Sequence, residues 1–166
     1  MATQLGVGSW PASRGRGGNV TGLSGQSPDL VGKQLQLLKE AVPGLSRVAA
    51  LSNPTHPGHP RSLREAEVAG RSLKVQLQIL EARAPSDVAG TFSAATKRSA
   101  GALLVLGDPM VSGERTRIVE LAAKSRLPLM GNRKEYAEAG GLMSYGPSTL
   151  DLFRRAATFV DKILKG

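Results

Sequence analysis

Two short apolar runs end in the same way, and together they constrain both the fold of this chain and the place where a ligand would bind. Residues 48–52 lead directly into Asn53-Pro54, and residues 103–107 lead directly into Asp108-Pro109. A short apolar run bounded by turn residues is typical of a buried strand, and a helical pattern follows each turn. Because the carboxyl ends of parallel strands form the edge where ligands bind, we expect Asn53 and Asp108 to face one crevice.

The same alternation of strand and helix continues along the chain. Strands that alternate with helices of about a dozen residues indicate βαβ units, and right-handed crossovers place helices on both faces of the sheet. We therefore predict an α/β fold: a three-layer, doubly wound, mostly parallel sheet with an extra C-terminal helix. The most apolar run, 102–106, is expected at the centre of the sheet and the alternating run 75–80 nearer an edge. The expected strands are 48–52, 75–80, 102–106, 127–130 and 142–145, and the expected helices are 27–43, 61–73, 85–98, 111–125, 134–139 and 151–165.

Composition excludes several classes of partner. The net charge of +9 comes from 22 Lys and Arg against 13 Asp and Glu, but the basic residues are scattered and aromatic residues make up only 4% of the chain. This pattern favours a solvated basic surface, and we expect no nucleic-acid partner. No run approaches the ~20 apolar residues of a membrane span. Residues 1–8 lack the basic and apolar regions of a secretory signal, so we expect no signal peptide.

Residues that could support catalysis or bind a metal do not converge. His56 and His59 lie in the loop 53–60 without further ligands, so we expect a pair of solvated histidines and no metal site. Ser24 lies in a Gly-Leu-Ser-Gly segment that misses the nucleophile-elbow spacing by one residue. With no convergent acid, base and nucleophile, we expect no enzymatic activity and no cofactor.

The C-terminal helix carries more apolar surface than a solvated helix needs. We expect this stripe to pack against a second copy of the chain or against its own α/β lobe, and we favour a homodimer because a terminal stripe can pair with itself about a two-fold axis. The stripe consists of Leu152, Phe153, Ala156, Ala157, Phe159, Val160, Ile163 and Leu164.

Several segments closely resemble one known family, the ABC-transporter substrate-binding proteins that include tryptophan and tyrosine binders. Besides the Asn53-Pro54 and Asp108-Pro109 turns, the resemblance rests on residues 17–23, 37–44, 138–146 (Glu-Ala-Gly-Gly-Leu-Met-Ser-Tyr-Gly) and 154–166. It implies a type 1 periplasmic-binding fold, in which two α/β lobes joined by a hinge close on a ligand. Family members are about twice this length and begin with a signal or lipoprotein sequence and a first lobe.

The resemblance also implies a domain organisation and a location. Residues 1–26 would be a partly extended segment that enters through the hinge, 27–146 the second lobe, and 147–166 a helix that crosses back towards a first lobe missing from this chain. A membrane permease would be the partner. The location would be periplasmic or otherwise extracytoplasmic, although a chain without a signal peptide is also compatible with the cytoplasm.

By the same resemblance, the ligand is held by residues at strand ends and at the hinge. Asp108 would suit an α-amino group, and Arg133 or the helix start after it would suit a carboxylate. Asn53 and Asp108 are equally compatible with turn and helix-entry roles, Arg133 with a solvated surface position, and Tyr145 with core packing. This chain has Gly131 where family members often carry an aromatic residue, which puts a ring-stacking contact in doubt. The candidate ligand-binding residues are Thr21, Ser24, Asn53, Asp108, Asn132, Arg133 and Tyr145.

The sequence thus predicts a solute-binding component of an ABC transport system. Its expected ligand is a small polar molecule such as an amino acid, bound between two lobes without catalysis. Three alternatives remain open: an effector-binding sensor domain on the same fold, a remnant lobe without tight binding, and a doubly wound enzyme.

Overall fold

A computed structural model of the chain describes residues 29–165. Its internal contacts divide it after Gly146 into an α/β unit and a second unit that contains the C-terminal helix, and the two are described separately. The predictions for residues 1–28, including the ligand contacts of Thr21 and Ser24, lie outside the described residues.

The α/β unit is built on a sheet of five parallel strands in the order β2-β1-β3-β4-β5. The predicted parallel pairing of β1 with β3 is confirmed, with Val48 opposite Ala102. The predicted positions of β3 at the centre and β2 at an edge are also confirmed. The strands are β1 (Arg47–Ser52), β2 (Gln76–Glu81), β3 (Ala102–Val105), β4 (Leu129–Gly131) and β5 (Met143–Ser144).

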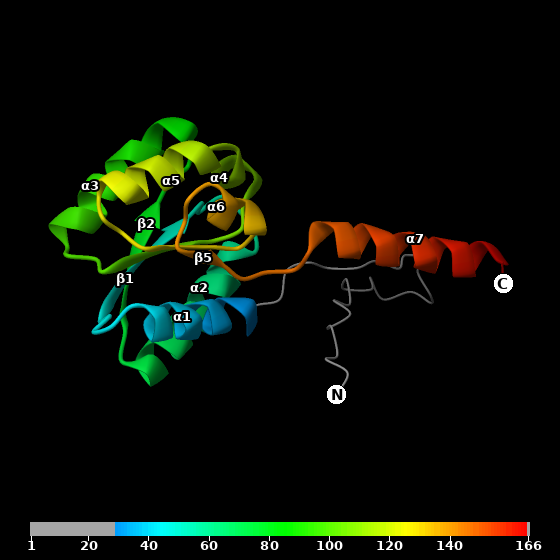
Figure 1. Cartoon of the computed structure of the whole chain (residues 1–166), viewed down its shortest axis with the longest axis horizontal. Helices are drawn as coiled ribbons and strands as arrows, with labels where there is room; N and C mark the ends of the chain where they lie inside the picture. The colour runs from blue at the N-terminus through cyan, green and yellow to red at the C-terminus, as the bar shows by residue number, and fades with distance from the viewer. Residues whose placement is uncertain (1–28, 166) are drawn as a thin grey trace. The chain divides into compact units, whose positions relative to one another are not determined.

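Helices cover both faces of the sheet, as the right-handed crossovers require (Figure 1). One face carries α1 and α2, and the other carries α3 to α6. The doubly wound α/β prediction is therefore confirmed. The helices of this unit are α1 (Asp29–Ala41), α2 (His59–Leu73), α3 (Val88–Lys97), α4 (Pro109–Gly113), α5 (Arg115–Lys124) and α6 (Lys134–Glu138).

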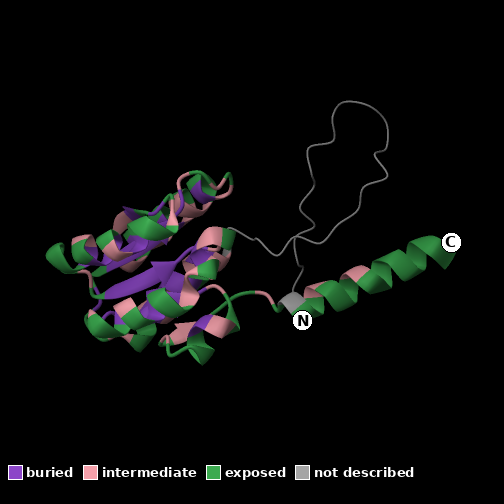
Figure 2. Ribbon diagram, turned by 90° about the horizontal axis from the view of Figure 1, so that it is seen from above, coloured by how far each residue is buried: buried purple, intermediate pink, exposed green. Residues whose placement is uncertain are grey.

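Two apolar cores, one on each side of the sheet, explain why β1 and β3 read as continuous apolar runs. Leu51 and Leu103 point into the core beneath α3 and α5, whereas Val48 and Leu104 point into the core beneath α1 and α2. A strand buried on both faces has no reason to alternate apolar with polar residues. Figure 2 shows the buried strands enclosed by helices whose outer sides are exposed.

Two predicted helices are divided in the structure. The predicted helix 111–125 is wrong as one element, because α4 ends at Gly113 and α5 begins at Arg115 with Glu114 between them (φ −88°, ψ 11°). A glycine in a helix interior costs about 1 kcal/mol relative to alanine, which favours a break there. The predicted helix 85–98 begins with a single 3₁₀ turn (Pro85–Asp87) before α3. The Asp87 carboxylate accepts hydrogen bonds from the backbone N–H groups of Arg83 and Ala84.

The second unit contains α7 (Thr149–Lys165), which begins two residues before its predicted start. Much of its apolar stripe is exposed: Phe153 is 70% and Leu164 is 80% accessible to solvent. Lys162 and Lys165 lie in its last turn, where basic side chains complement the helix dipole. None of the described helices is both long and apolar enough to cross a membrane.

Candidate ligand-binding rim

The carboxyl ends of β1 and β3 lie at the point where the strand order reverses. From β1 the chain crosses outward to β2, and from β3 it crosses in the other direction to β4. In open α/β sheets this switch point is where a crevice forms outside the strand ends. Asn53 follows β1 and Asp108 lies three residues beyond β3, so both predicted residues are at this edge, which we call the rim.

Asn53 and Asp108 touch each other, and the protein uses most of their hydrogen-bonding capacity. Asn53 Nδ2 donates to Asp108 Oδ2 over 3.1 Å. Asp108 Oδ1 accepts the backbone N–H of Val111 at 2.9 Å and so caps α4, while Asn53 Oδ1 accepts from the backbone N–H and the hydroxyl of Thr55. The two side chains are only 6% and 5% exposed. The turn and helix-entry roles left open by the sequence are therefore observed, and ligand contact by either residue stays a prediction.

His59, the first residue of α2, is a rim residue that the sequence analysis missed. The prediction of a solvated pair of histidines is wrong for His59, whose side chain is 2% exposed. Its Nδ1 lies 3.0 Å from Ser52 Oγ and accepts the backbone N–H of Asn53 at 2.9 Å, and its Nε2 lies 3.2 Å from the Gly107 carbonyl oxygen. The available signal was Pro60, which is typical of a helix start and places His59 where the chain turns back over the end of β1.

Asn132 extends the rim from β3 to β4. Its Nδ2 is 2.5 Å from the point where a Cβ on Gly107 would stand, so only glycine fits at position 107 while this amide keeps its place. Asn132 Oδ1 is shielded from solvent and has no hydrogen-bond partner within the described part of the chain. The Asn132 backbone carbonyl in turn abuts Gly146, where any Cβ would overlap the oxygen.

Arg133 and Tyr145 are the rim residues that face solvent. Arg133 precedes α6 in an extended conformation (φ −140°, ψ 149°), and its side chain is exposed. Tyr145 is 39% exposed, so core packing does not account for it. Its backbone is held firmly, because its N–H donates to the Gly131 carbonyl at 3.0 Å and its own carbonyl accepts from Gln34 Nε2 at 2.6 Å.

Gln34 is a second residue that the sequence analysis missed. It is buried on α1 and connects that helix to the segment through which the chain leaves the sheet. Its position on the predicted apolar face, three residues after Val31 and four before Leu38, was the signal: a buried amide needs a hydrogen-bond partner.

The structure also explains the glycine at position 131. A Cβ on Gly131 would overlap the Cβ of Tyr136, whose ring fills the adjacent space. Tyr136 is fully buried, and its hydroxyl donates to the Val111 carbonyl over 3.4 Å. Burial raises the pKa of the Tyr136 hydroxyl to about 12, so the ring stays neutral. With Tyr136 in this position, the lobe has no room for an aromatic side chain at position 131.

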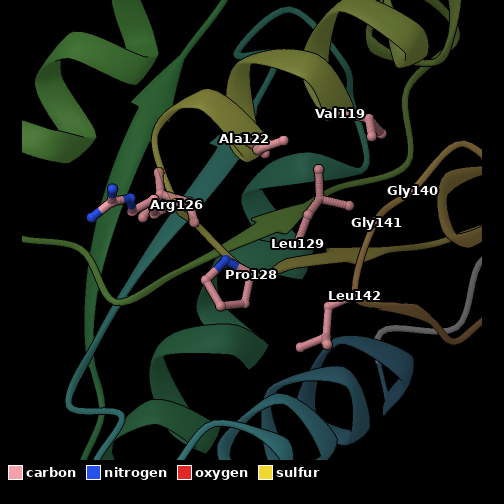
Figure 3. Close-up of a pocket in the computed structure, with 10 residues that line it drawn as sticks. Val119, Ala122, Arg126, Pro128, Leu129, Gly140, Gly141 and Leu142 are labelled. Atoms are coloured by element: carbon pink, nitrogen blue, oxygen red, sulfur yellow. The ribbon is translucent and has the colours of Figure 1, made fainter.

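A cavity of about 320 Å³ lies elsewhere, at the amino end of β4 between α5 and the turn before β5 (Figure 3). Its walls are mainly apolar, and the side chain of Arg126 extends away from Leu129 and Leu142. It lacks the few convergent polar groups that orient a small ligand. Nor do three or more His, Asp or Glu side chains gather anywhere in residues 29–165 as a metal site would require.

A rim of polar side chains at the switch point of a doubly wound lobe is suited to holding a small molecule, and comparison with known families agrees. The model of the family described as ABC transporter substrate binding protein matches residues 5–166. The chain belongs to this family. The family is one of binding proteins rather than enzymes, which confirms the prediction of a binding protein.

Solved structures similar to this family member share its fold. A conserved domain protein from Vibrio cholerae matches with a TM-score of 0.76 and 20% identity, over 88% of this chain and 47% of its own. The ABC domain from Streptococcus pneumonia in complex with L-Trp matches with a TM-score of 0.75 and 19% identity, over 82% of this chain and 46% of its own. A substrate-binding protein with adhesive properties from Clostridium difficile, in a ligand-free open structure, has a TM-score of 0.54 and 15% identity, over 58% of this chain and 32% of its own.

The chain thus spans a little less than half the length of the first two structures. No curated protein sequence matches it significantly.

Proposed function

We propose that this chain is the second lobe of a solute-binding component of an ABC transport system, and that it binds a small polar ligand without altering it. The observation that carries the proposal is the family match over residues 5–166. The rim supports it, because the edge formed by β1, β3 and β4 carries amide, carboxylate and guanidinium groups at adjacent strand ends.

The ligand we propose is an amino acid or a similar zwitterion. Arg133 is an exposed cation suited to a carboxylate, and the Asp108 carboxylate retains lone pairs for an ammonium group beyond the two hydrogen bonds it accepts from protein. Asn132 Oδ1, which lacks a partner in the described chain, is a second acceptor beside them. The Streptococcus relative is a complex with L-Trp, and the half-exposed ring of Tyr145 would suit an apolar ligand side chain.

Within this proposal the rim residues divide into two roles. Asn132, Arg133 and Tyr145 contact the ligand directly. Asn53 and Asp108 mainly hold the strand ends together, and Asp108 also accepts from the ammonium group of the ligand. Thr21 and Ser24 remain proposed contacts on the segment that precedes α1.

The family resemblance extends the proposal to location and partners. We place the full binding protein outside the cytoplasm, where it would deliver its ligand to a membrane permease. In the complete cleft the first lobe would close over the rim and supply the burial that a tightly held small ligand needs.

The exposed stripe of α7 leads us to propose a homodimer as well. Phe153, Phe159 and Ile163 are each about half exposed or more, and burying one large side chain contributes about 1.5–3 kcal/mol. A stripe along one helix is self-complementary about a two-fold axis.

The ligand proposal is tested by isothermal titration calorimetry of the full chain with the twenty amino acids and small carboxylates, L-tryptophan and L-tyrosine first. We expect saturable binding of at least one amino acid. Arg133→Ala should weaken that binding about tenfold or more, because a charge-assisted hydrogen bond contributes about 1.5–3 kcal/mol.

The matched control is Arg126→Ala, which removes an exposed arginine at the opposite end of the sheet and should leave affinity unchanged. Equal loss in both variants would show a general charge effect and would contradict a rim site. No binding of any compound would favour the alternative of a lobe that does not bind tightly on its own.

A further inference from the structure

The contacts of His59 determine the protonation state of its ring. The backbone N–H of Asn53 donates to Nδ1, so Nδ1 carries no proton. Nε2 faces the carbonyl oxygen of Gly107, which can only accept, so Nε2 carries the proton and donates it. The ring is therefore neutral, and it bridges the end of β1 to the end of β3 across the switch point.

The surroundings of the ring oppose a second proton. Within residues 29–165, two titratable groups face it: His56, in the turn after β1, with its ring centre 4.5 Å away, and Asp108, in the turn after β3. Burial is the main cause that lowers the pKa of His59 below its ordinary value of 6.5, and His56 adds to it. The hydrogen bond to the Gly107 carbonyl and the charge of Asp108 act in the opposite direction but do not prevail.

We propose that His59 is a proton-sensitive latch of the rim, a positioning residue whose neutral ring holds the ends of β1 and β3 together and whose protonation releases them. Ser52 Oγ, 3.0 Å from Nδ1, could accept a proton placed there. The Asn53 N–H would then face a donor in place of its acceptor, so that hydrogen bond would break. Because Asn53 Nδ2 donates to Asp108, a shift of the Asn53 backbone also disturbs the carboxylate beside it. The latch itself is independent of any ligand, and its effect on ligand affinity rests on the proposed function.

The direction of the pH dependence follows from proton linkage. Since His59 binds a proton more weakly in the folded chain than in the unfolded chain, the unfolded state gains protons first as the pH falls. Above pH 6.5, the ordinary pKa of a histidine, the latch makes its full contribution to stability. That contribution is lost as the pH falls from 6.5 through the lower pKa that His59 has in the folded chain.

The test is a histidine titration of the full chain without ligand, followed by nitrogen-15 NMR from about pH 8 to about pH 5, where histidines change charge. We expect one histidine to carry its proton on Nε2 at neutral pH and to titrate below 6.5. The backbone N–H resonance of Asn53 should shift with the same midpoint. The proposal is wrong if His59 titrates at or above pH 6.5. It is also wrong if the Asn53 N–H resonance does not shift when His59 is protonated.

Variants separate the latch from general effects of pH. His59→Asn keeps an acceptor near the Nδ1 position but cannot titrate. In the parent chain the urea concentration at the unfolding midpoint should decrease below pH 6.5, and in this variant that decrease should be absent. His56→Asn, in the same turn, should keep that decrease. An unchanged pH dependence in His59→Asn contradicts the proposal. If that variant does not fold, the titration of the unmodified chain decides the question by itself.

Discussion

Single residues at the rim either hold it together or face outward, and the difference lies in what their polar atoms touch. Asn53, Asp108 and His59 are buried, and their hydrogen bonds go to one another's turns. Arg133 and Tyr145 project from well-held backbone into solvent. A buried polar group without its partner costs about 1–3 kcal/mol, so the first group determines stability and the second is free to determine affinity.

The first prediction concerns Asp108. Asp108→Ala removes the cap of α4, which costs about 0.5–2 kcal/mol, and leaves the buried amide of Asn53 without its acceptor, which costs about 1–3 kcal/mol. Urea unfolding should therefore show a loss of about 1.5–5 kcal/mol. Asp108→Asn keeps an oxygen for the Val111 N–H and should lose less. Two variants as stable as the parent chain would refute a structural role for Asp108.

Sequence reasoning found the rim residues that follow strands directly and missed those whose partners are remote. Asn53 and Asp108 were recognised because a proline turn after an apolar run marks a strand end. Gln34 was missed because its acceptor, the Tyr145 carbonyl, is 111 positions away, and His59 because its Nε2 reaches across to Gly107, 48 positions away. Contacts of side chains with distant backbone groups leave no periodic pattern in a sequence.

At the scale of elements, β4 and α6 approach each other closely beside the rim. Gly131 and Gly141 both lie against Tyr136, the first against its Cβ and ring and the second against its backbone. The sequence predicted a strand, a short helix and a strand here, but it did not predict this contact. A glycine that permits close packing cannot be distinguished, from the sequence alone, from a glycine in a turn. The sequence analysis also missed the division of α4 from α5 at Glu114, because a single glycine is tolerated inside a helical pattern.

A second prediction tests this approach. Gly131→Ala places a Cβ into that of Tyr136, a buried residue that cannot move aside freely, and overpacking of this kind costs about 1–3 kcal/mol. Thermal unfolding should therefore begin at a lower temperature. Gly90→Ala is the control, because a Cβ at this position in α3 meets no atom within 4 Å and alanine favours a helix by about 1 kcal/mol over glycine. Destabilisation by both variants would point away from the Tyr136 contact.

At the scale of the whole molecule, the α/β unit and α7 differ in how far their apolar side chains are buried. The sheet has a helix-covered core on each face. In α7 large apolar side chains such as Leu150, Phe153 and Leu164 are exposed. The sequence predicted the helix and its stripe, since helical periodicity is a local property. The surface that covers the stripe lies outside the helix, so it cannot be derived from the helical periodicity of the apolar residues.

The prediction at this scale is that α7 associates with a second copy of the chain. Phe153→Asp combined with Phe159→Asp should give a monomer, because charged side chains at the centre of an apolar contact lose their hydration. Sedimentation over a range of concentrations measures the change. Arg155→Asp combined with Thr158→Asp adds the same two residues to the polar side of the helix and should leave the dimer intact. An unmodified chain that is monomeric at high micromolar concentration would rule out the association.

The contact between Gly146 and the Asn132 carbonyl has a consequence for signalling. A Cβ added to Gly146, the last residue of the α/β unit, would overlap the carbonyl oxygen of Asn132, so the backbones of these two residues pack closely. If Asn132 contacts the ligand as proposed, a ligand that repositioned it would also displace the end of the lobe, and a constraint on that end would change ligand affinity by the same factor, since coupling free energies are reciprocal. On the proposed function, the exit of the polypeptide from the lobe would therefore respond to the ligand.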